Sequence, residues 1–332
     1  MGIFASKSRP EFDPATDLPD LTGRVMIVTG GNSGIGYTTA LHLARRGAKV
    51  YIGARSEQRA KAAIERMRAE GLQPGNGEVL WFQLDLSDPR KAKESAEEFL
   101  KREDRLDVLV NNAGIMRVPY KVDRTYGLQQ NMLVNHFSHF VFTKTLLPLL
   151  SRTAKEPESD VRIVVLSSDL IRILKEQEVS FRDINDFNKD FRDRWRPDMY
   201  RYSLSKLANV LYAKELQRKL KTEGIPITVM AVDPGSVMTE GVERNPSMLT
   251  PIFGPLLKIV LRRLFLTPSE GAYTSVFAAA SPLVSAERAK YEGAWLVPPG
   301  KLGTPPAPHA ESTELAAELW KTTETILRSV DL

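Results

Sequence analysis

Cysteine is absent from the 332-residue chain. Disulfide bonds, thiolate zinc sites and cysteine nucleophiles are therefore excluded, while the compartment stays open. Histidine is scarce as well, with four residues. His136 and His139 share one face of an expected helix, but no acidic residue lies beside them in the sequence. We expect both histidines to pack in the core, and we predict no metal site.

Long hydrophobic runs are also missing. No window of about 18 uninterrupted apolar residues occurs, so no membrane-spanning helix is expected. The first ten residues, MGIFASKSRP, lack the apolar stretch of a secretory signal, and a cytoplasmic location is expected. The formal net charge is +5. Because the basic residues are scattered along the chain, they indicate no nucleic-acid partner. The excess of positive charge suits an anionic cofactor or a membrane surface equally well.

Short apolar runs alternate with helical patterns along most of the chain. The runs cover residues 24–29, 49–54, 78–86, 106–114, 161–168 and 227–235. Helical patterns cover residues 34–47, 56–70, 87–103 and 128–150. Buried strands that alternate with helices predict an α/β fold, a single Rossmann-like doubly wound parallel sheet with helices on both faces. We expect residues 1–22 to form an N-terminal arm outside the core and residues 23–332 to form one domain.

A glycine-rich turn, TGGNSGIG at residues 29–36, joins the first strand to the first helix. Glycines at such a turn let the backbone approach a pyrophosphate, which then lies on the helix N-terminus. The spacing is GxxxGxG, so it differs from the usual GxGxxG pattern, and a tight turn without a ligand is the alternative. The predicted cofactor contacts in the turn are Gly30, Asn32, Ser33, Gly34, Ile35 and Gly36.

Arg55 ends the second predicted strand, in Gly53-Ala54-Arg55. Many NAD-binding proteins have an acidic residue there for the ribose 2′-hydroxyl. A guanidinium instead forms charge-assisted hydrogen bonds with a 2′-phosphate, so Arg55 favours NADP(H), with Arg59 as a second contact. The alternative is that Arg55 is an ordinary surface charge.

Four motifs together resemble the short-chain dehydrogenase/reductase family. They are TGxxxGIG at 29–36, Asn-Asn-Ala-Gly at 111–114, a serine after the fifth strand, and Tyr-x-x-x-Lys at 202–206. The segments VNHFSHF, YSLSKLANVLYAKEL and AWLVPPGKLGTP are more closely similar to the retinol-dehydrogenase-like and fungal NADP-dependent branch. The resemblance covers nearly everything after the expected arm.

Two tyrosines precede the lysine of the last motif. Tyr202 lies four residues before Lys206, so the two share a helix face, whereas Tyr200 lies on another face. Free tyrosine titrates near ~10. An ammonium group at about 4 Å would lower the pKa of a phenol by roughly one to three units. Tyr202, and not Tyr200, is therefore the catalytic candidate.

The resemblance assigns the catalytic roles to Asn135, Ser168, Tyr202 and Lys206. It implies that Tyr202 exchanges a proton with the substrate and that Ser168, rather than its neighbour Ser167, hydrogen-bonds the substrate oxygen. Lys206 would lower the pKa of the phenol and hold the nicotinamide ribose, and Asn135 would complete a proton relay. A purely structural role for Asn135 is the alternative.

The same resemblance extends the cofactor site along the chain. Asp85 and Leu86 would contact the adenine, and residues 112–114 the adenosine ribose. Residues 233–239 would surround the nicotinamide, although Thr239 could instead cap a helix. Tyr202 and Lys206 are included among the contacts, and the remaining ones are Asn112, Ala113, Gly114, Pro234, Gly235, Val237 and Thr239.

Two segments bear on the substrate. Tyr202 follows Ser168 by 34 positions, and the charged stretch 176–198 between them is either a solvated loop or a wall of the substrate entrance. The region about 240–268 is rich in Leu, Ile and Phe and predicts an apolar lid, with a membrane-surface helix as the alternative. The N-terminal Met1-Gly2 with Ser6 also fits a myristoylation pattern, which would give weak peripheral membrane association.

The combined expectation is an NADP(H)-dependent oxidoreductase that acts on a lipophilic carbonyl compound or alcohol. A retinoid or other lipid and a secondary-metabolite ketone or aldehyde both fit as the small lipophilic substrate. The alternative is a catalytically silent NADP(H)-binding regulator or scaffold on the same fold. Pairing of helices could also make the protein a homo-oligomer.

Overall fold

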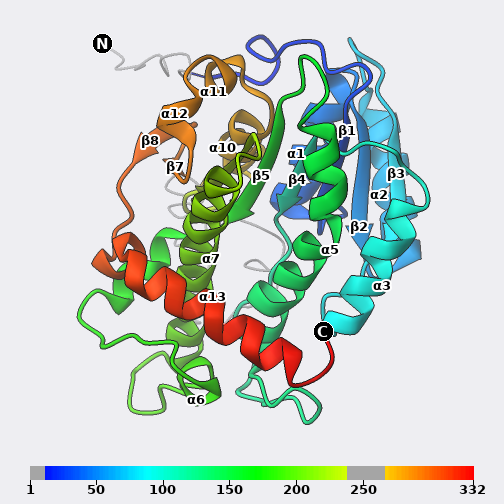
Figure 1. The fold of residues 1–332 in the computed structure, drawn as a ribbon. Coiled ribbons are helices and arrows are strands. Elements are labelled where there is room, and N and C mark those ends of the chain that lie inside the picture. The colour runs from blue at the N-terminus through cyan, green and yellow to red at the C-terminus, as the bar shows by residue number, and fades with distance from the viewer. Residues whose placement is uncertain (1–11, 238–265) are drawn as a thin grey trace, which may run out of the picture.

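A single eight-stranded sheet runs through the computed structural model, which describes residues 12–237 and 266–332 (Figure 1). The strand order is β3-β2-β1-β4-β5-β6-β7-β8. All neighbouring strands are parallel except β7 and β8. The strands are β1 Val25–Thr29, β2 Lys49–Ala54, β3 Val79–Gln83, β4 Val108–Asn111, β5 Val161–Leu166, β6 Ile227–Val232, β7 Trp295–Val297 and β8 Lys301–Gly303.

Helices connect the parallel strands, and local sequence sets their ends. At the third helix, the Asp88 side chain accepts a hydrogen bond from the Arg90 amide and Pro89 occupies the first helical position. The main helices are α1 Gly34–Arg45, α2 Glu57–Glu70, α3 Pro89–Leu100, α5 Ser138–Thr153, α7 Pro197–Thr222, α10 Pro268–Ala280 and α13 Thr313–Arg328. Shorter elements are α4 Gln130–Met132, η1 Leu133–Phe137, η2 Asp169–Leu174, α6 Ile184–Phe187, α11 Pro282–Ala286, α12 Arg288–Tyr291 and η4 Pro308–Glu311.

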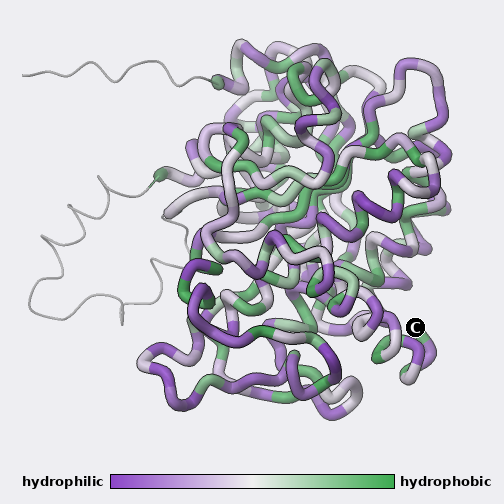
Figure 2. Tube along the Cα trace, turned by 60° about the vertical axis from the view of Figure 1, so that its left-hand side comes forward, coloured by the Kyte–Doolittle hydropathy of each residue, from purple (hydrophilic) through white to green (hydrophobic). Residues whose placement is uncertain are grey.

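The two faces of the sheet carry separate hydrophobic cores. Ile27 packs into the core shared with α3, α5 and α7, whereas its neighbours Met26 and Val28 pack into the core shared with α1, α2 and α10. This alternation follows from the two-residue period of a strand. Figure 2 shows the hydrophobic colour concentrated in these central strands. The predicted doubly wound α/β sheet with helices on both faces is confirmed.

The expectation that residues 1–22 lie outside the core is wrong for three apolar side chains of the described part, residues 12–22. Phe12, Leu18 and Leu21 are all buried. The ring of Phe12 packs edge-on against that of Phe277 in α10, with 5.2 Å between centroids. A Pro- and Asp-rich segment can thus place isolated apolar residues in the core, which its composition did not indicate.

The sheet is also not parallel throughout. β8 runs antiparallel to β7, and the turn at Gly300, with φ +105°, reverses the chain between them. Each of these strands has three residues, too few for a period of two to stand out in the sequence.

The predicted helix 128–150 is interrupted. α4 continues into the π-helical segment η1 and then into α5. Within η1, the Val134 carbonyl accepts a hydrogen bond from His139 Nδ1 at 3.1 Å. Asn135, one of the predicted catalytic residues, lies in this segment, as is common for π-helical turns at functional sites.

The C-terminal helix α13 lies across α7 on the outside of the molecule (Figure 1). Trp320 of α13 stacks on Tyr212 of α7, with 5.8 Å between ring centroids. Thr323 shares a hydrogen bond of 2.9 Å with His136 of η1. In the charged stretch 176–198, Phe181 and Phe187 are fully buried, so this insertion is more than a solvated loop.

Candidate active site

Thr29 connects the ends of two neighbouring strands, β1 and β4, where the strand order reverses. Its hydroxyl accepts hydrogen bonds from the backbone amides of Asn112 and Ala113, both at 2.9 Å. The Asn112 side chain donates in turn to the Thr29 carbonyl at 2.7 Å. Thr29 also lies 3.1 Å from His139 Nε2, and we assign the hydroxyl as the donor because Nδ1 faces a carbonyl. The glycine turn and the Asn-Asn-Ala-Gly segment are thereby fixed against each other.

A cavity of about 420 Å³ opens above this connection. It extends from the glycine turn at the start of α1 to Tyr202 and Lys206 on α7. Most of the predicted cofactor contacts line it together. They are Gly30, Asn32, Ser33, Gly34, Ile35, Gly36, Asn112, Ala113, Gly114, Tyr202, Lys206 and Pro234.

The glycine turn fits a pyrophosphate. Gly30 has φ +68°, a left-handed conformation that favours glycine. A side chain at Gly36 would collide with the Asn112 amide and the Gly30 carbonyl. Ser33, the N-cap of α1, makes no side-chain capping bond within the described chain, and the first turn holds no acidic residue. The first N–H groups of α1 are therefore suited to an anion.

A second cavity of about 370 Å³ continues the first. Both are lined by Gly30, Asn32, Ala113 and Gly114, so they form one groove across the ends of β1, β2 and β4. The second cavity brings together the other predicted contacts at the adenosine end: Arg55, Arg59, Asp85 and Leu86. Both arginine side chains are exposed at its edge.

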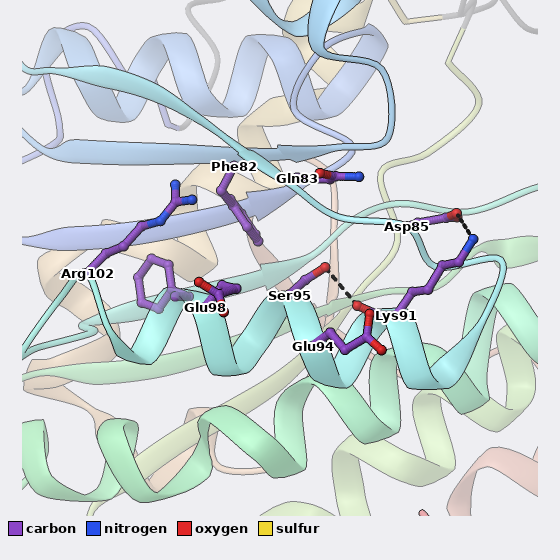
Figure 3. Close-up of a pocket in the computed structure, with 9 residues that line it drawn as sticks. Phe82, Gln83, Asp85, Lys91, Glu94, Ser95, Glu98 and Arg102 are labelled. Carbon is purple, nitrogen blue, oxygen red and sulfur yellow. Dashed lines mark hydrogen bonds and ion pairs between the residues drawn. The ribbon is translucent and has the colours of Figure 1, made fainter.

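Asp85 lies where this groove meets a third cavity. Its carboxylate accepts hydrogen bonds from the Ser87 amide and hydroxyl. It also pairs with Lys91 at 3.4 Å, as Figure 3 shows. Burial alone would raise the pKa of Asp85, but these partners outweigh burial and lower it. The third cavity, about 310 Å³ between β3 and α3, contains Glu94, Glu98 and no predicted catalytic residue, so we do not assign it as the site.

Tyr202 and Lys206 face the groove from one side of α7, as their spacing predicts. The ammonium nitrogen of Lys206 lies 5.7 Å from the centroid of the Tyr202 ring. Lys206 donates to the Leu166 carbonyl at 2.8 Å, and the Ser167 hydroxyl donates to the Lys206 carbonyl at 2.7 Å. Ser167 is thus used in packing α7 against β5. Tyr200 faces elsewhere, with its ring 5.4 Å from that of Phe191.

Burial is the main cause of the pKa shifts of Lys206 and Tyr202. It lowers the pKa of Lys206 to about 8. It also raises the pKa of Tyr202 above its ordinary value, and the negative charge of Asp233 raises it further, while a hydrogen bond with Ser168 lowers it. The structure therefore differs from the expectation that Lys206 lowers the pKa of Tyr202. The lysine is directed to a carbonyl, and Asp233 acts in the opposite sense.

Ser168 and Asn135 flank the pair without lining either cavity of the groove. Ser168 caps η2 and accepts from the Leu170 amide at 3.2 Å. Asn135 accepts from the Ile115 amide at 2.8 Å, and its amide nitrogen lies 2.9 Å from the Ile115 carbonyl. The same nitrogen lies 2.9 Å from the Ser205 hydroxyl. Asn135 thus holds the loop after β4 against α7.

Gly114 lies between Asn135 and Lys206. A side chain at Gly114 would lie 3.3 Å from the Asn135 amide oxygen and 3.5 Å from the Lys206 ammonium. The loop after β4, the π-helical segment and α7 therefore meet at one point beside the groove.

The remaining predicted contacts lie beyond β6. Gly235 has φ +77° and donates to the buried Asp233 at 3.1 Å. Val237 is buried and pairs with Leu266. Neither Gly235 nor Val237 lines the groove. Thr239, the N-terminal Gly2 and the predicted lid up to residue 265 lie outside the described residues.

Sequence reasoning missed three residues that line the Tyr202 end of the groove: Met116, Arg117 and Leu166. Only their position next to recognised motifs could have indicated them. Asp233 begins the predicted segment 233–239, but the sequence did not indicate that its charge acts on Tyr202. Within residues 12–237 and 266–332, no helix is both long and apolar enough to cross a bilayer.

The chain is similar to known oxidoreductases over its length. The family profile described as short chain dehydrogenase matches residues 24–172. A short-chain dehydrogenase/reductase of Armillaria gallica is 46% identical over 315 residues, 95% of this chain and 96% of that protein. Retinol dehydrogenase 14 of Mus musculus is 38% identical over 282 residues, 82% of this chain and 78% of that protein.

A solved structure agrees with these relatives. The crystal structure of an uncharacterized protein from Mycobacterium paratuberculosis superposes with a TM-score of 0.69 and 29% sequence identity. The alignment covers 96% of this chain and 97% of that one. Fungal and retinol-dehydrogenase relatives thus both occur among the similar proteins, as the sequence motifs predict.

Proposed function

Because the chain belongs to the short-chain dehydrogenase/reductase family, we propose that it is an NADP(H)-dependent enzyme that interconverts a lipophilic carbonyl compound and its alcohol. One observation carries the proposal. Tyr202 and Lys206 line the end of the groove from α7, and Ser168 lies close enough to Tyr202 to lower the pKa of its phenol. A family member that only bound the nucleotide would not need this arrangement.

The residues divide the chemistry between them. When bound, the nicotinamide supplies or accepts a hydride. Tyr202 gives a proton to the substrate oxygen in reduction and takes one back in oxidation. Ser168 donates a hydrogen bond to the same oxygen, which stabilises the charge that develops there. Lys206 binds the ribose hydroxyls beside the nicotinamide, and Asn135 holds the loop on which Gly114 lies.

Arg55 and Arg59 support NADP(H) over NAD(H). Both are exposed at the adenosine end of the groove, and neither is engaged by a carboxylate in the described part of the chain. A 2′-phosphate would accept charge-assisted hydrogen bonds from them. The nearest acid on the groove, Asp85, is already bound by Ser87 and Lys91.

Two observations support the proposal that the substrate is lipophilic. One is the relative named retinol dehydrogenase 14. The other is the Leu-, Ile- and Phe-rich sequence of the region about 240–268. Both fit a substrate whose carbon skeleton is largely apolar.

The test is NADPH oxidation against a panel of lipophilic ketones and aldehydes, with wild type beside Tyr202→Phe. The proposal expects turnover by wild type and its loss in the variant, while both proteins still bind NADPH. Binding of NADPH without turnover of any compound would favour a regulator or scaffold instead. Failure to bind NADPH would contradict the assignment of the glycine turn and Arg55.

A further inference from the structure

Arg117 is a buried cation at the reacting end of the groove. It follows the Asn-Asn-Ala-Gly segment and lines the same cavity as Tyr202 and Lys206. Its side chain is 8% exposed. Two of its nitrogens, Nε and Nη1, are buried and have no hydrogen-bond partner among residues 12–237 and 266–332. Buried guanidinium groups are normally paired and hydrogen-bonded, so this one calls for a partner.

Asp198, the acid that pairs with Arg117 in the described part of the chain, does not fully supply that partner. Arg117 Nε lies 3.7 Å from Asp198 Oδ2, too far for a hydrogen bond. Asp198 already forms two hydrogen bonds with Arg196, at 3.3 and 3.2 Å. Two guanidinium groups therefore face one carboxylate, which leaves one positive charge in excess. Burial and the charge of Arg196 accordingly lower the pKa of Arg117, and Asp198 raises it only in part.

The backbone of Arg117 is unusual too. Its φ is +57°, in the left-handed region that long side chains rarely adopt. The loop after β4 thus keeps a long cationic side chain at a position where glycine would be easier. Residues held in this way cluster at ligand-binding sites.

The position of Arg117 along α7 indicates which ligand it meets. Asp198, Tyr202 and Lys206 are spaced four residues apart on this helix, and four residues span about 6 Å. Lys206 lies toward the nucleotide end of the groove. Arg117, beside Asp198, lies on the other side of Tyr202, where the substrate must extend from its reacting oxygen.

We propose that Arg117 binds a carboxylate of the substrate, so that the preferred substrates are oxo acids, or the matching hydroxy acids, with an apolar chain. The inference rests on the proposed function. A guanidinium donates charge-assisted hydrogen bonds to the oxygens of a carboxylate, and Nε and Nη1 of Arg117 are donors without a partner in the described part of the chain. The carboxylate would lie about one helical turn, about 6 Å, from the carbon that accepts hydride.

The test compares oxo acids of six to twelve carbons with their methyl esters, using NADPH. Wild type, Arg117→Met and Arg117→Lys are assayed beside Arg124→Met, which changes an exposed arginine in the same connection between β4 and α4. We expect wild type to prefer acids by about 10- to 100-fold in kcat/KM. Arg117→Met should remove that preference through KM, with ester turnover and the Kd for NADPH unchanged. Arg117→Lys should restore part of it, and Arg124→Met should match wild type.

Other outcomes decide against the inference or against the function. Equal kcat/KM for acids and esters in wild type, or an unchanged preference in Arg117→Met, would overturn the inference. A weaker Kd for NADPH in Arg117→Met would assign the arginine to the nucleotide and also overturn it. If neither acids nor esters turn over, the proposed function fails for these compounds. Binding of dodecanoate to the protein–NADP⁺ complex then decides: loss in Arg117→Met supports the carboxylate site, and equal binding overturns it.

Discussion

The ammonium nitrogen of Lys206 lies 2.8 Å from the carbonyl oxygen of Leu166, the last residue of β5, and donates a hydrogen bond to it. This contact holds the middle of α7 against the sheet. Lys206 is only 3% exposed, so the chain keeps a positive charge almost completely out of water beside Tyr202. A buried charge of this kind lowers the free energy of unfolding, so we expect the chain to keep it only because the function requires it.

Lys206→Met should therefore stabilise the protein near pH 7. The folded-state pKa of about 8 lies below the ordinary 10.5, so the folded state disfavours the charged form. The shift corresponds to about 3 kcal/mol, less about 1 kcal/mol for the lost hydrogen bond. The free energy of unfolding should rise by about 2 kcal/mol at pH 7. Because Asn209 also donates to the Leu166 carbonyl, that oxygen keeps a partner.

The stability gain of Lys206→Met over wild type should also depend on pH, and the direction of this dependence follows from the lowered pKa of Lys206. The unfolded chain binds more protons than the folded one between pH 8 and 10.5, so wild-type stability increases with pH across this window. The advantage of Lys206→Met should be complete below pH 8 and shrink above it. Urea unfolding at several pH values measures this, with Lys214→Met as the control on the same helix. A variant less stable than wild type at pH 7 would contradict the prediction.

Tyr202→Phe should lower kcat by about 10²- to 10⁴-fold, because it removes only the proton donor. The Kd for NADPH should change less than about twofold, since the ring and its packing stay. Tyr200→Phe is the matched control, since Tyr200 packs against Phe191 away from the groove. Steady-state kinetics and NADPH titration of both variants check this. Equal activity of the two variants would remove Tyr202 from the chemistry.

Asp233→Asn should shift the pH profile of reduction to lower pH. The negative charge of Asp233 helps to raise the pKa of Tyr202, so its removal lowers that pKa. Reduction needs the protonated phenol, and its alkaline loss should move down by roughly half to one pH unit. Oxidation, which needs the phenolate, should correspondingly begin at lower pH.

The amide oxygen of an asparagine can still accept the hydrogen bonds that Asp233 receives from Asp169 and Gly235. Profiles of kcat against pH in both directions therefore report on the charge. Asp169→Asn, which changes a neighbouring and more exposed carboxylate, should leave the profile in place. Coincident profiles for Asp233→Asn and wild type would show that the phenol does not sense Asp233.

Arg55→Gln should weaken NADPH binding by about 10-fold or more and leave NADH binding nearly unchanged. The reason is that only NADPH carries the 2′-phosphate expected at the edge of the groove. The control is Arg68→Gln, which removes the same charge from the exposed side of α2. Fluorescence titration with both nucleotides distinguishes them. Parallel losses for NADPH and NADH would point to a general effect on the adenosine end instead.

The sequence predicted the parts of the site that depend on local spacing. The glycine turn lies within one strand-to-helix connection, and Tyr202 with Lys206 lies within one helical turn, so both follow from periodicity. Arg117 reaches the same site from another segment, and no local pattern marks it. Asp233 begins the predicted segment 233–239, but its effect on the pKa of Tyr202 depends on how that segment folds against α7. The π-helical turn at Asn135 differs from an α-helix by one residue, which a hydrophobic period cannot reveal.

The fold likewise has parts that the local sequence predicts and parts that it does not. The six strands β1 to β6 were visible as short apolar runs. The short strands β7 and β8 were not, and the burial of Phe12 depends on α10, far along the chain. The branch-specific likeness, in turn, came from residues of η1, α5 and α7 and from the C-terminal region.

The position of α13 has a practical consequence for anyone who shortens this protein or surveys its natural variation. The matched family profile stops at residue 172, yet the final helix supports both η1 through Thr323 and α7 through Trp320. A fragment cut at the profile boundary would lose the helix that carries Tyr202, and one cut before Thr313 would uncover aromatic rings beneath it. Inherited changes in the last twenty residues can thus impair catalysis without altering any residue that touches the substrate.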